Sequence, residues 1–209
     1  MSTVLVLTSS VLGEASVSNR LVQDAVARLR SQEPSRRIVM RDLGGSPIPH
    51  LNFDAAAAIR GAAPSTAAQA AARALSDELI AEQRAAEIII IGAPMYNFGI
   101  ASTLKTWFDH VVRAGITFRY SESGAVGLLE GKRAIVIETR GGLFSEGPMQ
   151  VMDSQEPHLR TLLGFMGIDD VTFIRAETLA LGPDVRERSI DAARGKLGQI
   201  IHNDYLHAA

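Results

Sequence analysis

The amino-acid sequence predicts an α/β fold: a doubly wound parallel sheet of five strands with helices on both of its faces. Five short apolar segments recur along the chain, and such segments are typical of buried parallel strands. Stretches with apolar residues at helical spacing separate them, and right-handed βαβ crossovers are the easiest connection between parallel strands. A chain of 209 residues is expected to form one domain, spanning residues 1–209.

The five expected strands leave room for helices between them. Residues 4–7 form the expected central strand, and residues 88–91, four isoleucines in a row, form the clearest one. The other three are residues 38–40, 134–137 and 171–174. Residues 117–120 are also expected to be extended, and residues 121–124 form a loop after them.

Apolar spacing predicts helices over residues 18–30, 102–114 and 159–166, and a last helix begins near Pro183. Residues 55–74 contain twelve alanines, interrupted by Gly61 and Pro64. Alanine favours helix but adds little to a core, so this stretch is expected to begin a surface helix pair that covers one sheet face. Thr66 and Gln69 could form a capping box for the second helix, which reaches about residue 86.

Composition excludes several classes of protein. Twenty-one basic residues against 23 acidic ones give a net charge of −2, without a block of like charge, so nucleic acid is not expected as a partner. The chain has no cysteine, which removes disulfides, thiolate nucleophiles and cysteine-ligated metals together. Any redox chemistry must therefore come from a bound cofactor.

The sequence also gives no sign of a membrane protein or a metalloenzyme. The N-terminus lacks the basic region of a signal peptide, and no apolar run approaches the ~20 residues of a membrane span, so a cytoplasmic protein is expected. The histidines lack HExxH spacing, so no metal ion is expected, and each is interpreted as structural or solvated. They are His50, His110, His158, His202 and His207.

Ligands of doubly wound sheets bind outside the carboxyl ends of the strands. After the first expected strand, residues 9–19 contain four serine hydroxyls and run into the start of a helix. Hydroxyls and free helix N–H groups together can surround a phosphate, although serines in this place can also be simple N-caps. No glycine has another glycine two residues later, and GxxxxGK[ST] is missing, so a dinucleotide or triphosphate turn is not expected.

The loops after the third and fourth of these strands could hold the rest of a flat ligand. Residues 92–99 place two aromatic side chains, a thioether and an amide in a turn made rigid by Pro94 and Gly99, although each could instead pack on the next helix. Gly141 and Gly142 let main-chain N–H groups approach a ligand, or serve only a tight turn. Phosphate, ring and polar-edge contacts at one sheet edge match one ligand, FMN.

The chain resembles the FMN-dependent NAD(P)H:quinone oxidoreductases and azoreductases, a family of flavodoxin-like homodimers. The most specific stretch, residues 93–98, reads Ala-Pro-Met-Tyr-Asn-Phe. Further matches in order include Trp107-Phe108-Asp109, Thr117-Phe118-Arg119-Tyr120, Arg140-Gly141-Gly142 and Gly182-Pro183. The resemblance implies a flavodoxin-like fold, bound FMN, NADH or NADPH as electron donor, and a homodimer whose interface completes the active site.

The resemblance also implies a set of site residues. Those expected to bind FMN are Ser10, Ser16, Val17, Ser18, Pro94, Met95, Tyr96, Asn97, Phe98, Thr139, Arg140, Gly141 and Gly142. Those expected in the substrate pocket are Phe118, Tyr120, Phe144 and Leu162. The chain departs from the family pattern at Gly99, Thr139, Phe144 and Leu162, which leaves FMN binding expected and bears on substrate preference.

We therefore expect a ping-pong reaction in which NAD(P)H gives a hydride to the flavin N5 atom, and a quinone or azo compound then accepts two electrons. No side chain need act as a nucleophile, in agreement with the missing cysteine and GxSxG motif. Arg140 could polarise the flavin pyrimidine or form a surface ion pair. The alternatives are a flavodoxin-type carrier that does not oxidise NAD(P)H, which the near-neutral charge disfavours, and a flavin-free dimer that only binds partners.

Overall fold

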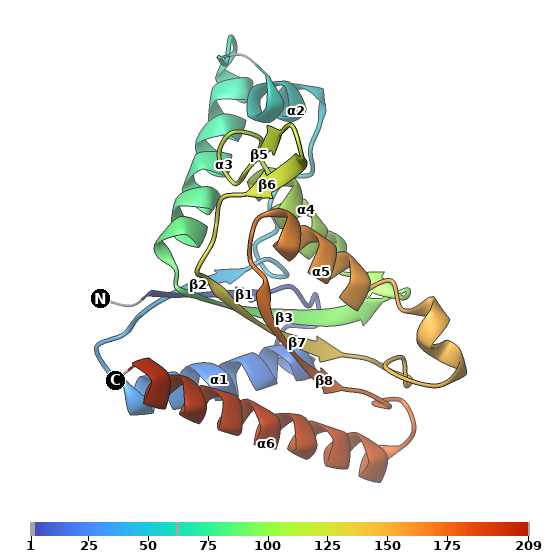
Figure 1. Ribbon diagram of the computed structural model, residues 1–209. Coiled ribbons are helices and arrows are strands. Elements are labelled where there is room, and N and C mark those ends of the chain that lie inside the picture. Colours follow the sequence, from blue (N-terminus) through green and yellow to red (C-terminus); the bar gives the residue numbers. More distant parts are fainter. Residues whose placement is uncertain (1–2, 62, 209) are drawn as a thin grey trace.

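The computed structural model describes residues 3–61 and 63–208, and their side chains as far as residue 202 (Figure 1). Its central sheet has the strand order β2-β1-β3-β7-β8, with all neighbours parallel. These strands are β1 (Thr3–Thr8), β2 (Arg37–Asp42), β3 (Ile88–Tyr96), β7 (Arg133–Thr139) and β8 (Asp170–Ala176). The five-stranded parallel sheet predicted from the sequence is confirmed, and the strand order reverses at β1.

Helices cover both faces of the sheet, as predicted. On one face lie α1 (Val17–Gln32) and α6 (Pro183–Ala208), and on the other lie α3 (Ala67–Ala85), α4 (Ser102–Val111) and α5 (Glu156–Phe165) (Figure 1). Side chains of β1 alternate between the two resulting cores: Leu5 and Leu7 belong to the core of α3, α4 and α5, and Val4 and Val6 to that of α1 and α6. The continuous apolar run of this strand therefore reflects two buried faces.

The alanine-rich region differs from its prediction. Its two helices, α2 (Phe53–Arg60) and α3, pack closely on each other, and α3 alone adds large side chains, Leu79 and Ile80, to the sheet core. Figure 1 shows α2 beside the end of α3 that lies away from the sheet. The expectation that both helices cover the sheet is wrong, because the small alanines of α2 fit a close helix pair instead.

Only half of the expected capping box forms. Thr66 Oγ1 accepts a hydrogen bond from Gln69 N at 3.2 Å, which confirms the N-cap of α3. The Gln69 side chain does not return to Thr66, since its Oε1 accepts from Ser65 N at 2.9 Å.

The third sequence-predicted strand continues further than expected. Pro94 is still part of β3, paired with Thr139 of β7, and the chain reverses only at Asn97 and Phe98 to form the short antiparallel strand β4 (Gly99–Ile100). Asn97 and Phe98 have φ angles of 47° and 71°, a left-handed conformation that is uncommon for residues other than glycine. The rigid turn therefore lies at the tip of the predicted loop.

Residues 118–120 of the predicted extended segment belong to a separate two-stranded hairpin, β5 (Phe118–Ser121) and β6 (Gly124–Gly127), whereas Thr117 lies in the turn before it. Figure 1 places the hairpin beside α3, away from the edge where β3 and β7 end. Gly127 lies against the end of α5, where an added Cβ would come within 2.1 Å of Gly167 N. Two short 3-10 helices, η1 (Gly13–Ala15) and η2 (Pro148–Met152), complete the elements of the described chain. None of its helices is long and apolar enough to cross a membrane.

Candidate functional site

The loop between β1 and α1 forms a pocket suited to an anion. Ser10, Ser16 and Ser18 are only 2%, 3% and 0% exposed, and Ser16 Oγ lies 3.0 Å from Ser18 Oγ. Ser16 also caps α1 by accepting from Asn19 N at 3.2 Å. Within the described residues, the N–H groups of Val17 and Ser18 have no hydrogen-bond acceptor. Buried hydroxyls and free helix N–H groups thus coincide, and this pattern suits a phosphate.

Hydrogen bonds connect the segments that end β1 and β3. Tyr96 Oη lies 3.2 Å from Ser10 Oγ and accepts from Val11 N at 3.3 Å. Ser9 Oγ donates to Gly92 O at 2.7 Å on the neighbouring strand. Sequence reasoning assigned Ser9 no separate role, because its hydrogen-bond partner is 83 positions away along the chain.

The tip of the β3 loop is open. Met95 still pairs with Ile100 of β4, whereas Asn97 and Phe98 are exposed. Phe98 meets Phe144 edge to face with a centroid distance of 6.1 Å, and its carbonyl accepts from Ser154 N at 3.0 Å. Among the described residues, the N–H groups of Asn97 and Phe98 have no acceptor, so both can donate to a ligand.

The loop after β7 offers backbone donors at the same sheet edge. Gly141 O and Gly142 O accept from Ala180 N and Thr178 N, each at 3.0 Å, whereas neither glycine N–H has a partner in the described part of the chain. Thr139, the last residue of β7, is almost fully buried. The paired glycines therefore present the main-chain donors that the sequence led us to expect.

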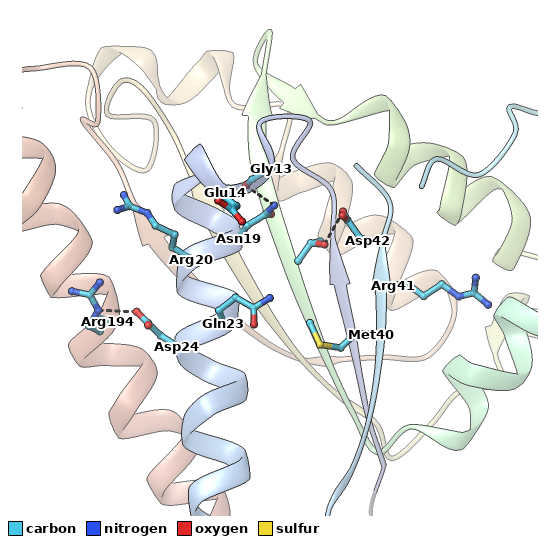
Figure 2. A pocket seen from close by; sticks show the side chains of 11 residues that line it. Gly13, Glu14, Asn19, Arg20, Gln23, Asp24, Met40, Arg41, Asp42 and Arg194 are labelled. Atoms are coloured by element: carbon cyan, nitrogen blue, oxygen red, sulfur yellow. Dashed lines mark hydrogen bonds and ion pairs between the residues drawn. The ribbon is translucent and has the colours of Figure 1, made fainter. Parts of the chain in front are cut away.

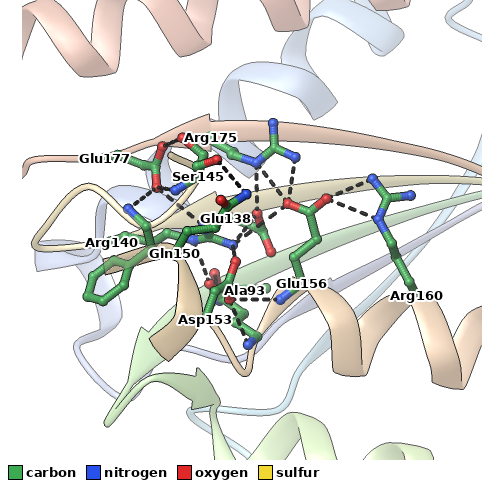
Figure 3. Close-up of polar contacts among 12 residues, drawn as sticks. Ala93, Glu138, Arg140, Ser145, Gln150, Asp153, Glu156, Arg160, Arg175 and Glu177 are labelled. Carbon is green, nitrogen blue, oxygen red and sulfur yellow. Dashed lines mark hydrogen bonds and ion pairs between the residues drawn. The ribbon is translucent and has the colours of Figure 1, made fainter. Parts of the chain in front are cut away.

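Arg140 lies between these groups, but its side chain turns inward (Figure 3). Its guanidinium is fully buried and contacts Glu138 Oε2 at 2.7 Å, Asp153 Oδ2 at 3.0 Å and Glu177 Oε1 at 3.2 Å. Its Nε donates to Gln155 Oε1 at 2.9 Å. The surface ion pair considered for Arg140 is therefore wrong, because its guanidinium is buried and does not reach the surface of this edge.

The carboxylates of this cluster differ in their electrostatics. Burial raises the pKa of Glu138 to about 8, although Arg140 opposes the shift, and Glu138 Oε1 has no hydrogen-bond partner among the described residues. The pKa values of Glu156 and Glu177 are lowered instead. Burial alone would raise them, but hydrogen bonds from Arg175 to Glu156 and from Ser145 to Glu177 contribute more in the opposite direction, together with nearby arginines. Glu138 is therefore the carboxyl group that holds a proton near neutral pH.

The four residues predicted for the substrate pocket do not meet in one place. Phe144 touches the ring of Phe98 at the sheet edge, whereas Leu162 is half-buried against the core of α3, α4 and α5. Phe118 and Tyr120 line a separate hollow of about 400 Å³ between the hairpin, α2 and α5. Within one chain, the hairpin residues thus lie apart from the loops that end β1, β3 and β7 (Figure 1).

A further hollow of about 590 Å³ lies between α1 and the edge strand β2 (Figure 2). It borders the β1 loop at Gly13 and the first turn of α1 at Asn19, and it carries charges of both signs. Arg194 at its margin pairs with Asp24 at 2.8 Å. No motif in the sequence pointed to this hollow.

Two histidines have structural roles. His110 Nε2 lies 3.0 Å from Pro49 O, and His50 Nδ1 lies 2.9 Å from Thr106 Oγ1. The side chain of His207 lies beyond residue 202, where the described side chains end. In the part of the chain that the structure describes, histidine, aspartate and glutamate form no group of three or more that could hold a metal ion.

Comparison with known proteins identifies the family. A family model described as flavodoxin-like fold matches residues 2–201, so the chain belongs to this family, in agreement with the fold and the resemblance stated from the sequence. The chain is 52% identical over 200 residues to the FMN-dependent NADH:quinone oxidoreductase of Hyphomonas neptunium, with 96% of each chain covered. It is 46% identical over 202 residues to the protein of the same name from Escherichia coli O157:H7, covering 96% of this chain and 99% of the relative.

Solved structures of azoreductases share the fold. The azoreductase from Bacillus anthracis str. Sterne has a TM-score of 0.87 and 25% identity, covering 97% of this chain and 100% of its own. An FMN-dependent NADH-azoreductase from Bacillus anthracis str. Ames Ancestor, solved in complex with FMN, has the same TM-score of 0.87 at 21% identity, covering 97% and 99%. At 21% identity, the similarity to this second structure is evidence for a shared fold alone.

The buried Glu138 predicts a specific pH dependence of stability. Its pKa of about 8 in the folded protein exceeds the ordinary value of 4.5, so between these pH values the folded state keeps a proton that the unfolded state has lost. Its contribution to the free energy of unfolding is full below pH 4.5 and is lost as the pH rises through about 8. Glu138→Gln mimics the protonated acid, so urea unfolding from about pH 5 to pH 9 should show a smaller loss of stability than in the unaltered protein.

Glu146→Gln is the matched control, because Glu146 is exposed on the loop after β7. It should retain the pH profile of the unaltered protein. A Glu138→Gln profile that parallels that of the unaltered protein over this pH range would contradict the assignment of the proton to Glu138.

Proposed function

We propose that this chain is an FMN-dependent oxidoreductase that takes electrons from NADH and passes them to a quinone, with azo compounds as further acceptors. The proposal rests on one observation: at one edge of the sheet, an anion pocket and free backbone N–H groups lie in the loops that follow neighbouring strands. Relatives spanning nearly the whole chain, at 46–52% identity, are named for this reaction. These names describe enzymes that oxidise NADH, and they therefore support the enzyme over a flavodoxin-type carrier.

The residues present fit FMN. The phosphate suits the hydroxyls of Ser10, Ser16 and Ser18 and the free N–H groups at the start of α1, without a lysine or arginine. The flavin ring suits the segments that end β3 and β7. Those segments comprise Pro94, Met95, Tyr96, Asn97 and Phe98 and, opposite them, Thr139, Arg140, Gly141 and Gly142. When bound, FMN supplies the two-electron redox chemistry.

The chain itself positions ligands and supplies hydrogen-bond donors. The free N–H groups of Gly141 and Gly142 suit the carbonyl oxygens of a flavin pyrimidine, and the Asn97 amide suits its polar edge. Phe98 and Phe144 provide apolar surface next to these donors. No titratable side chain is required to react. In the part of this sheet edge that the structure describes, the charged guanidinium of Arg140 is buried inside the protein.

Anaerobic stopped-flow absorbance tests the reaction. Purified protein loaded with FMN should lose its visible flavin absorbance on mixing with NADH and regain it on mixing with a quinone or an azo dye, because both half-reactions use the same bound flavin. Free FMN at the same concentration is the control. Bound flavin that no pyridine nucleotide bleaches would instead identify an electron carrier, and protein that binds no FMN would contradict both readings.

Ser18→Ala tests the phosphate pocket. Loss of the buried hydroxyl should weaken FMN binding about tenfold and leave riboflavin binding unchanged, because riboflavin has no phosphate. Fluorescence quenching measures both affinities. Ser31→Ala is the control, since Ser31 lies in the last turn of the same helix and is exposed. Equal weakening of FMN and riboflavin would place Ser18 away from the phosphate.

We also infer that two copies of the chain combine to complete the substrate pocket. Two exposed apolar surfaces support this. The rim surface lies around the ends of β3 and β7 and consists of Phe98, Leu143, Met149, Val151 and Met152. The hairpin surface consists of Tyr120 and Phe165, which are 74% and 36% exposed and border the hollow near Phe118. In a twofold dimer each surface could cover the other, which would bring Phe118 and Tyr120 to the partner's flavin.

Val151→Glu tests this arrangement. Val151 is 91% exposed, so the substitution should leave the fold intact, but a charge in the rim surface should weaken a dimer of twice 22.4 kDa. Light scattering across a concentration series measures the effect. Leu181→Glu, at a residue 62% exposed in the turn before α6, should leave the mass unchanged. A monomeric unaltered protein with full quinone reductase activity would contradict the shared pocket.

A further inference from the structure

We propose that Arg140 is a positioning residue that fixes the two ring-binding loops, the end of β3 and the end of β7, relative to each other from inside the protein. The inference rests on the proposed function, because it concerns the FMN site assigned there. Three sets of contacts connect the buried guanidinium with segments that border this site (Figure 3). None of these contacts requires the side chain to touch the flavin.

The first set of contacts runs to the end of β3. Arg140 Nε donates to Gln155 Oε1 at 2.9 Å, and Gln155 Nε2 donates to Ala93 O at 2.8 Å. Gln155 is fully buried, and both ends of its amide are used. Ala93 directly precedes Pro94 in β3, so a path of two hydrogen bonds joins the β7 loop to the β3 loop.

The second set fixes the segment after the paired glycines. Glu177 Oε1 lies 3.2 Å from Arg140 Nη1 and accepts from Phe144 N at 2.9 Å and Ser145 N at 3.0 Å. These contacts hold the backbone on the far side of Gly142. They also place the Phe144 ring against Phe98.

The third set reaches the turn at the tip of β3. Asp153 Oδ2 lies 3.0 Å from Arg140 Nη2, while its Oδ1 accepts from Gln155 N at 2.8 Å. The next residue, Ser154, donates its N–H to Phe98 O at 3.0 Å. The connection between η2 and α5 is thereby held to both Arg140 and the tip of the β3 loop.

The stability of the sheet alone does not explain why a charged cluster is buried around Arg140. A buried ion pair commonly adds little stability compared with apolar residues of similar size. Here the planar guanidinium uses its separate N–H groups for Gln155, Glu138 and Glu177 in fixed directions, and its Nη2 also lies 3.0 Å from Asp153 Oδ2. A lysine is a single point charge and cannot hold these partners at once. The contacts of Arg140 therefore define the geometry of the flavin-ring end.

Arg140→Lys and Gln155→Met test the proposal. Gln155→Met keeps the length of the side chain, breaks the path to Ala93, and leaves the carboxylate contacts of Arg140 in place. Each variant should weaken FMN and riboflavin about tenfold and to the same extent, because the defect lies at the ring and not at the phosphate. The visible absorption bands of the bound flavin should also shift. Arg160→Gln is the matched control, since Arg160 lies at the exposed margin of the cluster and pairs with Glu156.

The outcomes separate this inference from the proposed function. Unchanged affinities and flavin spectra in folded Gln155→Met protein, checked by circular dichroism, would overturn the positioning role alone. Weaker FMN binding with unchanged riboflavin binding would also overturn it, because the effect would then lie at the phosphate. Unaltered protein that binds neither flavin would overturn the proposed function and this inference together.

Discussion

The parallel pairing of β1, β3 and β7 is the constraint on which the candidate site depends. Thr8 at the end of β1 pairs with Gly92, and Pro94 two residues later pairs with Thr139 at the end of β7. Parallel pairing brings the carboxyl ends of all three strands to the same edge, so segments far apart in the chain emerge side by side. The strand order reverses at β1, which opens this edge between the helices on the two faces.

The two ends of the site use different means to order the backbone. At the phosphate end, short hydroxyl side chains and the start of α1 leave N–H groups free, and a neutral pocket suits an anion. At the ring end, free backbone N–H groups and apolar side chains face outward, and the buried guanidinium of Arg140 lies beneath them. A guanidinium surrounded by carboxylates contributes directional hydrogen bonds while its charge is largely compensated. The flavin ring would therefore meet backbone dipoles and apolar side chains, not a bare charge.

Much of the fold and the buried serines at the start of α1 could be predicted from the sequence, because their signals are local. Four isoleucines in a row specify a buried strand, and a run of serines before a helix specifies its start. The Arg140 cluster could not be predicted in this way, since Glu177 is 37 positions away and only the fold brings them together. A turn was predicted within residues 92–99, but its position at Asn97 and Phe98 could not be, because an aromatic residue such as Phe98 rarely adopts a left-handed conformation. The position of the β5–β6 hairpin depends on a close backbone approach between Gly127 and Gly167, which no spacing rule detects.

The turn at Asn97 and Phe98 sets a limit on how stable this protein can become without losing its ligand geometry. Two adjacent residues in a left-handed conformation cost about 1–3 kcal/mol each, and the short β3–β4 pairing holds them there. Glycine would relieve that cost but would remove the amide or the ring that the turn displays. If these residues bind the flavin as proposed, thermostability and flavin recognition compete at these two positions, and stabilising substitutions are better sought elsewhere in the chain.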